Sequence, residues 1–494
     1  MQELFKGQEV TIDGADVPVT GLAYDSREVT PGVLFAALVG VESDGHGYIA
    51  RAVEGGATCV LCERDVDTGS ATRVLSGDAR RSLALAARVF FDNPSAKLRS
   101  VGITGTNGKT TCAHLIAEVM RAGGLSSGII GTLGVQYNEV SRETGFTTPE
   151  SVELLRLLQE MVDAGVAGVV MEVSSHALSQ RRVAGVEFDV GVFTNLTQDH
   201  LDYHESLDAY FEAKALLFRR NLKESGVGVV NLDDPRVATL MAPGMVGFST
   251  RADSGAAVWL KDERHNAEGM MLQIETPRGV CALRSSLVGD FNVENILAAV
   301  ATGVALDVSL DQIAAGVGRV PAVPGRLERV SVEGGASLPL VLVDYAHTPD
   351  ALEKALKALR GITKGRLICV FGCGGDRDAS KRGPMGAACA AHADWSVVTS
   401  DNPRTEDPET IAAAVVEGLE VAGARRGSVA LQGGYEVELE RERAIELAIE
   451  SAGEGDCVLI AGKGHEQYQI IGKEKRWFDD REQGYEVLKS LNEG

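Results

Sequence analysis

Long hydrophobic runs are missing from this chain of 494 residues. No apolar stretch approaches the ~20 residues that a membrane-spanning helix requires, so we expect no membrane span. The first residues, MQELFKGQEV, mix polar and charged side chains, which is not the pattern of a secretory signal. Cysteine is also scarce: the eight cysteines are scattered, which indicates a reducing compartment and no disulfide framework. We therefore expect a cytoplasmic protein.

Positive charge is in short supply as well. Lys and Arg together number 48 against 70 Asp and Glu, which gives a net charge of -22. Nucleic acids and anionic membranes favour clustered positive charge, so we expect neither as a partner. A small anionic ligand needs only a local cluster and remains possible. The composition, with 44% hydrophobic and 24% charged residues, is typical of a folded globular protein, which we expect to be a monomer.

Cys59 and Cys62 form a C-x-x-C pair in the segment TCVLCE. A zinc site would need a second pair of Cys or His residues nearby, and none follows in this part of the sequence. We therefore interpret both cysteines as core residues of a strand and predict no zinc site there.

The order of apolar segments predicts an α/β protein of three domains. Residues 1–97 form a small α/β domain, with strands at 32–38 and 57–63 and a helix at 79–91. Residues 98–322 alternate apolar strands with amphipathic helices, which predicts a central P-loop-type parallel sheet with helices on both faces. Residues 323–494 repeat this alternation and predict a smaller, Rossmann-like C-terminal α/β domain. Pro321 and Pro324 mark the second boundary.

Within the two larger domains the pattern places the individual elements. In the central domain we expect strands at 99–104, 167–173, 188–195 and 227–232, and helices at 110–122, 150–163, 205–220 and 291–306. In the C-terminal domain we expect strands at 338–345, 366–372, 395–400 and 456–462, and helices at 349–360, 381–392 and 408–421.

The segment VGITGTNGKTT, residues 101–111, has the composition of a phosphate-binding loop between a strand and a helix. Glycines let phosphates approach the backbone, a lysine reaches the β- and γ-phosphates, and a hydroxyl binds Mg²⁺. Gly105, Gly108, Lys109 and Thr110 supply these groups, although Ile103 stands where the strict spacing requires glycine. The segment predicts ATP or GTP binding; the alternative is a glycine-rich turn without a ligand.

Three further residues occupy positions at which a role in metal binding or catalysis is possible. Glu172 ends a buried strand, so it should lie at the carboxyl edge of the sheet, where it could hold Mg²⁺ together with Thr110; alternatively it is a solvated strand end. Lys214 shares a helix face with apolar neighbours, where desolvation lowers its pKa; alternatively it covers that face with its stem. His200 follows another strand, and a role in starting a helix or in hydrogen bonding is open to it and to His204.

Several segments in this order resemble the ATP-dependent Mur ligase family. They are TGTNGKTT, MEVSSHAL, TNLTQDHLDYH, YFEAKALLF, GDFNVENILAA, PGRLE, DYAHTPDAL, GCGGDRD, DNPR and GKGHE. The resemblance extends over essentially the whole chain. It implies an ATP-dependent, ADP-forming amide ligase of peptidoglycan precursor synthesis. It further implies that meso-2,6-diaminopimelate is added to the D-Glu γ-carboxylate of UDP-N-acetylmuramoyl-L-alanyl-D-glutamate through an acyl phosphate.

The resemblance also assigns residues. It implies catalytic roles for Lys109, Lys214, His200 and Glu172, and two Mg²⁺ ions held by Thr110, Glu172, His200 and a CO₂-derived carbamate on Lys214. The ATP-binding residues it implies are Gly105, Thr106, Asn107, Gly108, Lys109, Thr110, Thr111, Asn292, Asn295, Arg326 and Asp344. From its position, Asn292 could also cap the helix that it opens.

The resemblance also implies which residues bind the two other substrates. For the UDP substrate the resemblance implies Tyr24, Ser26, Thr147, Thr148, Ser174, Gln180 and Arg182; positions 41–43 match it poorly, and Phe146 replaces the Asn that some relatives carry. For diaminopimelate it implies Arg377, Asp401, Asn402, Pro403, Arg404, Gly462 and Glu466. Pro403 should stiffen the loop and present the Arg404 guanidinium to a carboxylate.

Three alternatives remain at this point. A lysine-adding sister enzyme would share nearly everything except the amino-acid pocket. A folylpolyglutamate-synthetase-like ligase would share the loop and the lysine, but should lack DNPR and the first domain with its DSR segment. A nucleotide-binding scaffold without activity is the alternative of a different class, which the presence of Lys109, Glu172 and Lys214 disfavours.

Overall fold

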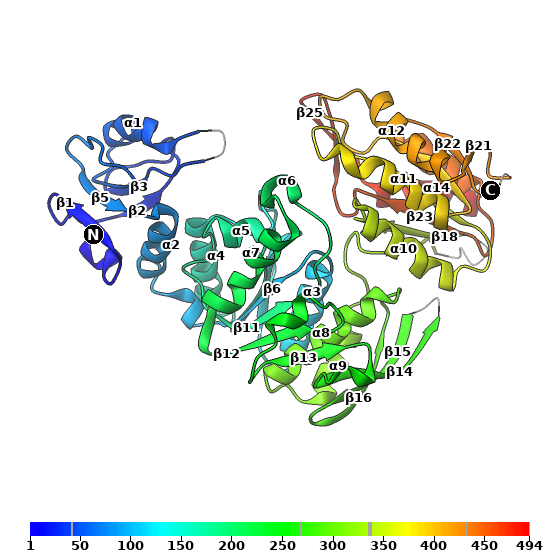
Figure 1. Cartoon of the computed structure of the whole chain (residues 1–494), viewed down its shortest axis with the longest axis horizontal. Coiled ribbons are helices and arrows are strands. Elements are labelled where there is room, and N and C mark those ends of the chain that lie inside the picture. Colours follow the sequence, from blue (N-terminus) through cyan, green and yellow to red (C-terminus); the bar gives the residue numbers. More distant parts are fainter. Residues whose placement is uncertain (41–42, 267–268, 334–337, 431, 494) are drawn as a thin grey trace.

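The computed structural model describes residues 1–40, 43–266, 269–333, 338–430 and 432–493. Three large sheets follow one another along the chain, and each carries helices (Figure 1). Among the described residues, no helix combines the length and the apolar character needed to cross a bilayer. Positions 41 and 42, which belong to the segment that matched poorly, lie outside the described residues.

The first unit is a five-stranded sheet of order β1-β5-β4-β3-β2, in which only β1 runs antiparallel to its neighbour. Its elements are β1 (Val10–Asp13), β2 (Gly21–Ala23), β3 (Val33–Ala36), β4 (Cys59–Cys62), β5 (Thr72–Ser76), α1 (Ile49–Glu54) and α2 (Ala79–Phe90). Cys59 and Cys62 are buried strand residues of β4 with free thiols, so the interpretation as core residues is confirmed.

The central unit is an eleven-stranded sheet of order β16-β15-β14-β13-β12-β11-β6-β10-β7-β8-β9. Its strands from β14 to β7 are parallel, which agrees with the predicted parallel sheet. They are β6 (Arg99–Thr104), β7 (Ser127–Gly131), β10 (Gly168–Glu172), β11 (Phe188–Phe193), β12 (Leu222–Asn231), β13 (Val246–Ser249) and β14 (Val258–Asn266). Antiparallel strands extend both ends: β15 (Gly269–Thr276) and β16 (Gly279–Ser285) at one, and β8 (Gly134–Tyr137) and β9 (Val140–Arg142) at the other.

Helices cover both faces of the central sheet, as predicted. The helices α3 (Lys109–Ala122), α8 (Phe291–Ala305) and α9 (Leu310–Gly318) contribute to one hydrophobic core. The helices α4 (Ser151–Asp163) and α7 (Leu207–Arg220), with the short α5 (Ser175–Ser179), contribute to the other, and α6 (Leu201–His204) precedes α7. This second core is continuous with apolar side chains of the first unit such as Leu34 and Leu83, because α2 packs against α4 (Figure 1).

The third unit is a seven-stranded sheet of order β17-β18-β23-β19-β20-β22-β21, in which only β17 is antiparallel. The strands are β17 (Glu328–Val330), β18 (Leu340–Asp344), β19 (Leu367–Phe371), β20 (Trp395–Val398), β21 (Arg425–Arg426), β22 (Gly434–Val437) and β23 (Cys457–Ala461). One face packs on α10 (Pro349–Ile362), α11 (Arg382–His392) and α12 (Pro408–Val421), and the other on α13 (Arg441–Glu450) and α14 (Asp480–Glu493). A hairpin of β24 (Tyr468–Ile471) and β25 (Glu474–Trp477) lies outside this sheet.

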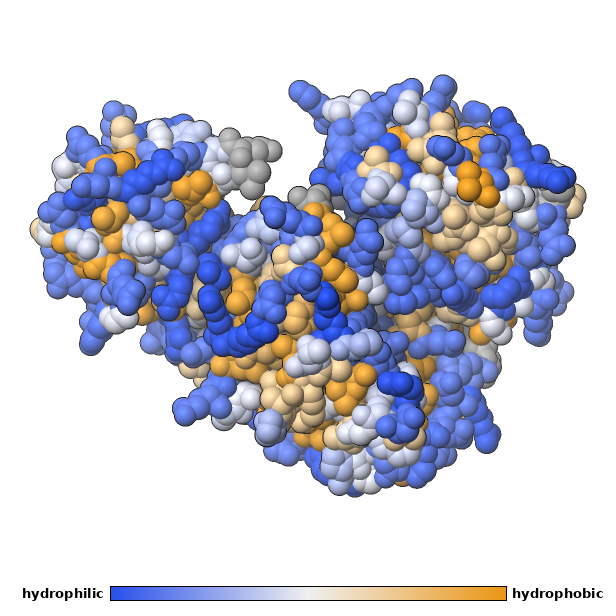
Figure 2. Space-filling view, in the orientation of Figure 1, coloured by the Kyte–Doolittle hydropathy of each residue, from blue (hydrophilic) through white to orange (hydrophobic). Residues whose placement is uncertain are grey.

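The three units form a row with the central one in the middle (Figure 1). In the space-filling view an open notch separates the first and third units above the central unit (Figure 2). Many of the candidate ligand-binding residues, such as Lys109, Glu172, Asp401 and Glu466, lie at the ends of parallel strands or shortly after them, which is where open α/β sheets bind ligands.

Candidate active site

The phosphate loop connects β6 to α3, and two of its glycines have no room for a side chain. Gly105 has φ +142°, and a Cβ there would lie 1.9 Å from Thr194 Oγ1. Gly108 has φ +85°, and a Cβ would lie 2.2 Å from Asn295 Oδ1. Both glycines are therefore required for the loop conformation. Gly102, one residue from the position of the strict motif, lies instead inside β6 against Leu217 and Phe188.

This crowding predicts that Gly105→Ala distorts the loop. We expect the substitution to lower the free energy of unfolding by about 2 kcal/mol or more and to weaken ADP binding, as measured by denaturant titration and calorimetry. Gly124→Ala is the matched control, because Gly124 also has a positive φ but open space around it. It should cost only about 1 kcal/mol and leave ADP affinity unchanged. Equal losses in both variants would contradict the steric explanation.

Lys109, the first residue of α3, folds back onto the loop. Its ammonium donates to the carbonyl oxygens of Gly105 at 2.9 Å and Thr106 at 2.7 Å. Burial lowers the pKa of Lys109, an effect that the carboxylate of Glu172 opposes. The lysine is thus held where phosphates would approach the loop, as its position in the sequence predicts.

Thr110 and Glu172, which were predicted to share a cation, are in contact. Thr110 Oγ1 donates to Glu172 Oε2 at 3.1 Å, and Thr132 donates to the same carboxylate through its backbone N–H at 2.9 Å and its hydroxyl at 3.1 Å. Glu172 is only 1% exposed, so it is not the solvated strand end of the alternative interpretation. The carboxylate lies at the end of β10, and Gly131 leaves space for it, since a Cβ there would be 2.3 Å from Oε1.

Lys214 lies inside the protein on α7. It is 1% exposed, and its Nζ donates to Gly105 O at 2.8 Å, the oxygen that Lys109 also contacts. The Tyr210 ring centroid is 4.4 Å from its Nζ. Burial, and then the charge of Lys109, lower the pKa of Lys214 well below its usual range, as the apolar helix face predicted. Because the amine is not at the surface, the alternative of a lysine that covers the helix face is wrong.

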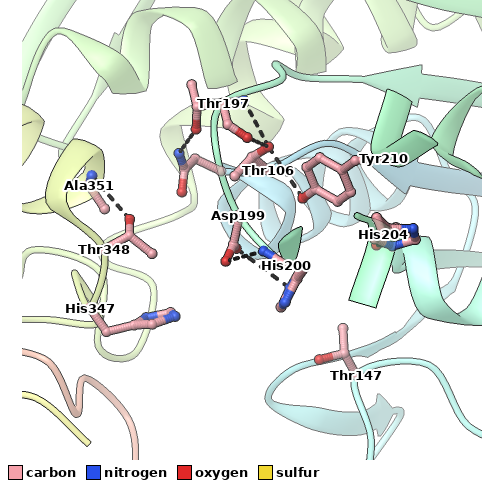
Figure 3. A network of polar contacts seen from close by, with 12 residues as sticks. Thr106, Thr147, Thr197, Asp199, His200, His204, Tyr210, His347, Thr348 and Ala351 are labelled. Atoms are coloured by element: carbon pink, nitrogen blue, oxygen red, sulfur yellow. Dashed lines mark hydrogen bonds and ion pairs between the residues drawn. The ribbon is translucent and has the colours of Figure 1, made fainter. Parts of the chain in front are cut away.

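His200 and His204 flank the short helix α6. His200 has φ +53° and stands at the N-terminal boundary of the helix. Its Nε2 lies 3.5 Å from Asp199 Oδ2, and its ring centroid lies 4.8 Å from that of His176. His204 is buried and hydrogen-bonds to Ser175 Oγ at 2.9 Å, which matches the structural role open to it. Figure 3 shows Asp199 and His200 directed toward the space that separates them from His347 of the third unit and from Thr147.

A cavity of about 80 Å³ lies where α3, α8 and α10 meet, between the central and third units. It gathers most of the residues predicted to bind the nucleotide, namely Asn107, Gly108, Thr110, Thr111, Asn295, Arg326 and Asp344. Arg326 reaches across the units, since its Nη2 donates to Thr110 Oγ1 at 3.1 Å. Asp344 accepts from the backbone N–H groups of Leu327 at 2.7 Å and Ala346 at 2.8 Å, which fixes the carboxylate at the end of β18.

The structure contradicts the helix-capping role that was open to Asn292. It does not cap α8, whose N-cap position is Asp290. It is buried in the first turn, where its side chain donates to Val288 O at 2.7 Å and accepts from Asn295 Nδ2 at 2.9 Å. Asn292 therefore fixes the orientation of the Asn295 amide, which itself lines the cavity.

The sequence interpretation missed other residues around this cavity. Asn195, Phe291, Glu294, Ala351, Lys354 and Ala355 also line it. Phe291 and Glu294 share the GDFNVENILAA segment with the two predicted asparagines, so their spacing on one helix turn could have identified them. Lys354 comes from α10 and pairs with Asp350 at 3.1 Å; no local pattern in the sequence connects it to the phosphate loop.

A second cavity of about 520 Å³ lies in the first unit. Tyr24 and Ser26 line it, as predicted, together with Arg27, Tyr48, Arg51 and Arg80, which the prediction did not include. Ser43, the described member of the poorly matching segment, lines it as well. Three arginines around one cavity suit an anionic ligand. Arg80 also lies 3.6 Å from Glu150 of the central unit.

The remaining residues predicted for the UDP substrate cluster near Glu172. Thr148 donates to Glu172 O at 2.9 Å and accepts from Ser174 N at 3.1 Å. Arg182 donates to Thr148 O at 3.0 Å and to Gln180 Oε1 at 2.8 Å. Thr147 lies beside Thr132, with 3.2 Å between their hydroxyl oxygens. The structure therefore brings Thr147, Thr148, Ser174, Gln180 and Arg182 together.

The residues predicted for diaminopimelate gather around the loop that follows β20. Arg404 has φ +52°, and its backbone is bonded on both sides to the hairpin, N–H to Ile470 O at 3.0 Å and O from Gly472 N at 2.7 Å. Its Nη1 donates to Gly375 O at 2.7 Å. Pro403 was expected to set this position, but the contacts with the hairpin also hold it. The exposed Arg377 and the Arg404 guanidinium both lie close to Gly374, where an added Cβ would be 2.9 Å from Arg404 Nη1 and 3.8 Å from Arg377 Cγ.

Asp401, Asn402, Gly462 and Glu466 complete this group. Asn402 Nδ2 donates to Glu466 Oε2 at 2.9 Å, and its Oδ1 accepts from Ile470 N at 2.9 Å. Gly462 has φ +114°, and a Cβ there would be 2.6 Å from Asp401 Oδ2. The segments SDNPR and GKGHE, about 60 residues apart, are therefore neighbours in space, as the prediction required.

The described residues contain no cluster of three or more His, Cys, Asp and Glu side chains arranged for a metal ion. Thr110 and Glu172 offer oxygen ligands only, which Mg²⁺ prefers, and Mg²⁺ commonly takes few protein ligands beside substrate phosphates and water. The residues at the phosphate loop therefore fit a magnesium ion that arrives with a nucleotide.

Comparison with known proteins agrees with this site. Residues 18–94 match the description "Mur ligase family, catalytic domain", residues 103–303 match "Mur ligase middle domain", and residues 325–464 match "Mur ligase, glutamate ligase domain". The chain therefore belongs to the Mur ligase family, and it is an enzyme of the ligase class.

Individual relatives are similar over nearly the whole chain. A UDP-N-acetylmuramoyl-L-alanyl-D-glutamate--2,6-diaminopimelate ligase from Gloeobacter violaceus is 46% identical over 475 residues, which cover 96% of this chain and 94% of the relative. One of the same name from Geobacter metallireducens is 46% identical over 490 residues, 96% and 95% of the two chains. A solved structure of that name has a TM-score of 0.69 at 33% identity and covers 97% of both chains.

Proposed function

We propose that this enzyme adds meso-2,6-diaminopimelate to the D-Glu γ-carboxylate of UDP-N-acetylmuramoyl-L-alanyl-D-glutamate, with hydrolysis of ATP to ADP and phosphate. One observation carries the reaction type: Lys109 and Lys214 meet at Gly105 O beside the Thr110–Glu172 pair, in a loop built for phosphates. The names of the relatives supply the substrates. The reaction belongs to peptidoglycan precursor synthesis, and we expect a cytoplasmic monomer.

In this proposal the three units, with boundaries near residues 97 and 322, share the binding of the three substrates. The first unit (residues 1–97) binds the UDP moiety through the cavity that Tyr24 and Ser26 line, and Thr147, Thr148, Ser174, Gln180 and Arg182 bind the dipeptide end. The central unit (98–322) binds ATP with Arg326 and Asp344 of the third. The third unit (323–494) binds the amino acid.

The chemistry proceeds in two steps. The γ-carboxylate attacks the γ-phosphate of ATP, which releases ADP and forms an acyl phosphate. The amine of diaminopimelate then attacks the acyl carbon, phosphate leaves, and the amine loses a proton. Lys109 neutralises charge on the transferred phosphoryl group, and the remaining residues hold the three substrates in register.

Mg²⁺ fits this site on its oxygen ligands, Thr110 and Glu172, and we propose two ions, the second held by His200 and by a carbamate on Lys214. When bound, Mg²⁺ neutralises phosphate charge. The buried amine of Lys214, whose pKa burial lowers, suits carbamate formation, since it is the neutral form that reacts with CO₂. Residues 105–111 with Asn292 and Asn295 would surround the nucleotide.

The choice of amino acid is assigned to Arg404. L-lysine ends in an ammonium, whereas meso-diaminopimelate ends in an ammonium and a carboxylate. A guanidinium can bind that carboxylate with two hydrogen bonds but repels a lone ammonium. Arg377, Asp401, Asn402, Pro403, Gly462 and Glu466 would complete the pocket for this zwitterionic end.

ADP release with the UDP-linked dipeptide tests the assignment. The unmodified enzyme should prefer meso-diaminopimelate strongly over L-lysine, and Arg404→Ala should lower kcat/KM for diaminopimelate by about 10- to 100-fold. Arg476→Ala is the control, because Arg476 lies on the neighbouring hairpin but pairs with Glu474 at the surface. Equal use of both amino acids by the unmodified enzyme would favour the lysine-adding alternative and contradict the proposal.

A further inference from the structure

Lys463 is a fully buried lysine at the edge of the proposed amino-acid pocket. It follows β23 between Gly462 and Gly464, and its side chain is 0% exposed. Both flanking glycines have positive φ, +114° and +54°, and a Cβ on either would collide, with Asp401 at one and with Tyr345 at the other. The tight backbone that glycine permits here places Lys463 beneath the loop and away from solvent.

The Lys463 ammonium has two polar partners, and both are residues proposed to form the pocket. Its Nζ lies 3.3 Å from Asn402 Oδ1 and 3.4 Å from Glu466 Oε2. It also lies 5.5 Å from the centre of the Tyr468 ring. A buried charge without partners would be very unfavourable, so this arrangement ties the ammonium to both residues.

These contacts settle the orientation of the Asn402 amide. Its Oδ1 faces the Lys463 ammonium and the Ile470 N–H, both of which can only donate, so its Nδ2 must face Glu466. The cation also offsets the effect of burial on Glu466: burial raises the pKa of this carboxyl, and Lys463 opposes the rise. Removing the ammonium would take away one of the two donors to Asn402 Oδ1 and would destabilise the ionised form of Glu466.

We propose that Lys463 is a positioning residue for the incoming amino acid, which holds Asn402 and Glu466 in their binding geometry without touching the ligand. This inference rests on the proposed function of the third unit and adds to it a residue on which amino-acid affinity depends. Because Lys463 is in contact with neither the phosphate loop nor the cavity of the first unit in the described structure, its effect should be confined to one of the three substrates.

Steady-state kinetics with each substrate varied in turn tests the inference. Lys463→Met keeps the length of the side chain but removes the charge, and we expect KM for diaminopimelate to rise about tenfold or more. KM for ATP and for the UDP-linked dipeptide should stay within about twofold, because Lys463 contacts neither of the sites proposed for these two substrates. Lys475→Met is the matched control, because Lys475 also lies over the Tyr468 ring, at 3.8 Å, but is exposed. It should leave all three KM values unchanged.

Other outcomes are equally decisive. An unchanged KM for diaminopimelate in folded Lys463→Met, or an equal rise for all three substrates, would overturn the positioning role. If Lys463→Met does not fold, Lys463→Arg keeps the charge but changes the geometry of both contacts. It should then raise KM for diaminopimelate severalfold, and no change would overturn the proposal. Failure of the unmodified enzyme to ligate diaminopimelate would instead contradict the proposed function.

Discussion

Lys109→Ala should abolish ligation while leaving the protein folded. The Lys109 ammonium contacts two carbonyl oxygens of the phosphate loop, so a phosphate at this loop would meet it directly. Without the ammonium, the charge on the transferred phosphoryl group loses a charge-assisted contact. Comparable groups contribute about 10³-fold or more to the rate. ADP release with all substrates at saturation is the measurement, with circular dichroism to verify the fold.

A second lysine of the same cavity provides the comparison. Lys354 lines the cavity but is about half exposed and pairs with Asp350 at 3.1 Å. Its surface ion pair should contribute little to stability, and Lys354→Ala should retain most of the turnover. Near-normal turnover of folded Lys109→Ala would remove the basis for placing ATP at this loop.

The parts of the site that lie on contiguous segments could be predicted from the sequence. Gly105, Gly108, Lys109 and Thr110 share one loop, and a strand followed by glycines and a helix allows few geometries. Glu172 could be placed because the carboxyl ends of parallel strands meet at one sheet edge. Most helices and parallel strands also began and ended within a few residues of their predicted positions.

Other parts could not be predicted, for physical reasons that particular residues illustrate. Thr132 binds Glu172 from a turn between two strands, and a lone threonine in a turn carries no periodic signal. The antiparallel strands β15 and β16 largely alternate exposed and buried residues and contain charged side chains, so they lack the continuous apolar character that marks the parallel strands. The position of Arg404 depends on a hairpin more than 60 residues away. Asn292 bonds through its side chain to Val288 O and to Asn295 in place of a cap.

Lys214→Ala should be as inactive as Lys109→Ala, but for a different reason. Burial, and then the charge of Lys109, lower the pKa of Lys214 well below its usual range, which favours the neutral amine over the ammonium. A neutral amine adds to CO₂ at its carbon, forms an N–C bond and releases one proton, which leaves a carbamate with two carboxylate-type oxygens. The burial that disfavours a bare ammonium here leaves the nucleophilic amine available, and the neighbouring charge of Lys109 would favour the resulting anion.

The carbamate can be distinguished from a lysine that merely binds Gly105 O. If the carboxylate-type oxygens are required, acetate or formate should partly restore turnover to Lys214→Ala, because a small acid can occupy the space of the missing group. The same salts should have no effect on Lys109→Ala, whose missing group is a cation. Lys214→Arg keeps a positive charge and a donor for Gly105 O, so the simpler role predicts residual activity for it, whereas the carbamate predicts none.

A crystal structure with ATP and Mg²⁺ bound gives the direct test, since mass spectrometry of the denatured chain would lose a carbamate. Density for three atoms beyond Nζ is the expected result. A well-resolved bare ammonium at Lys214 in that complex would refute the carbamate. Failure of both acids to rescue Lys214→Ala, together with substantial turnover of Lys214→Arg, would refute it in solution as well. Lys214 would then remain as a donor that holds Gly105 in place.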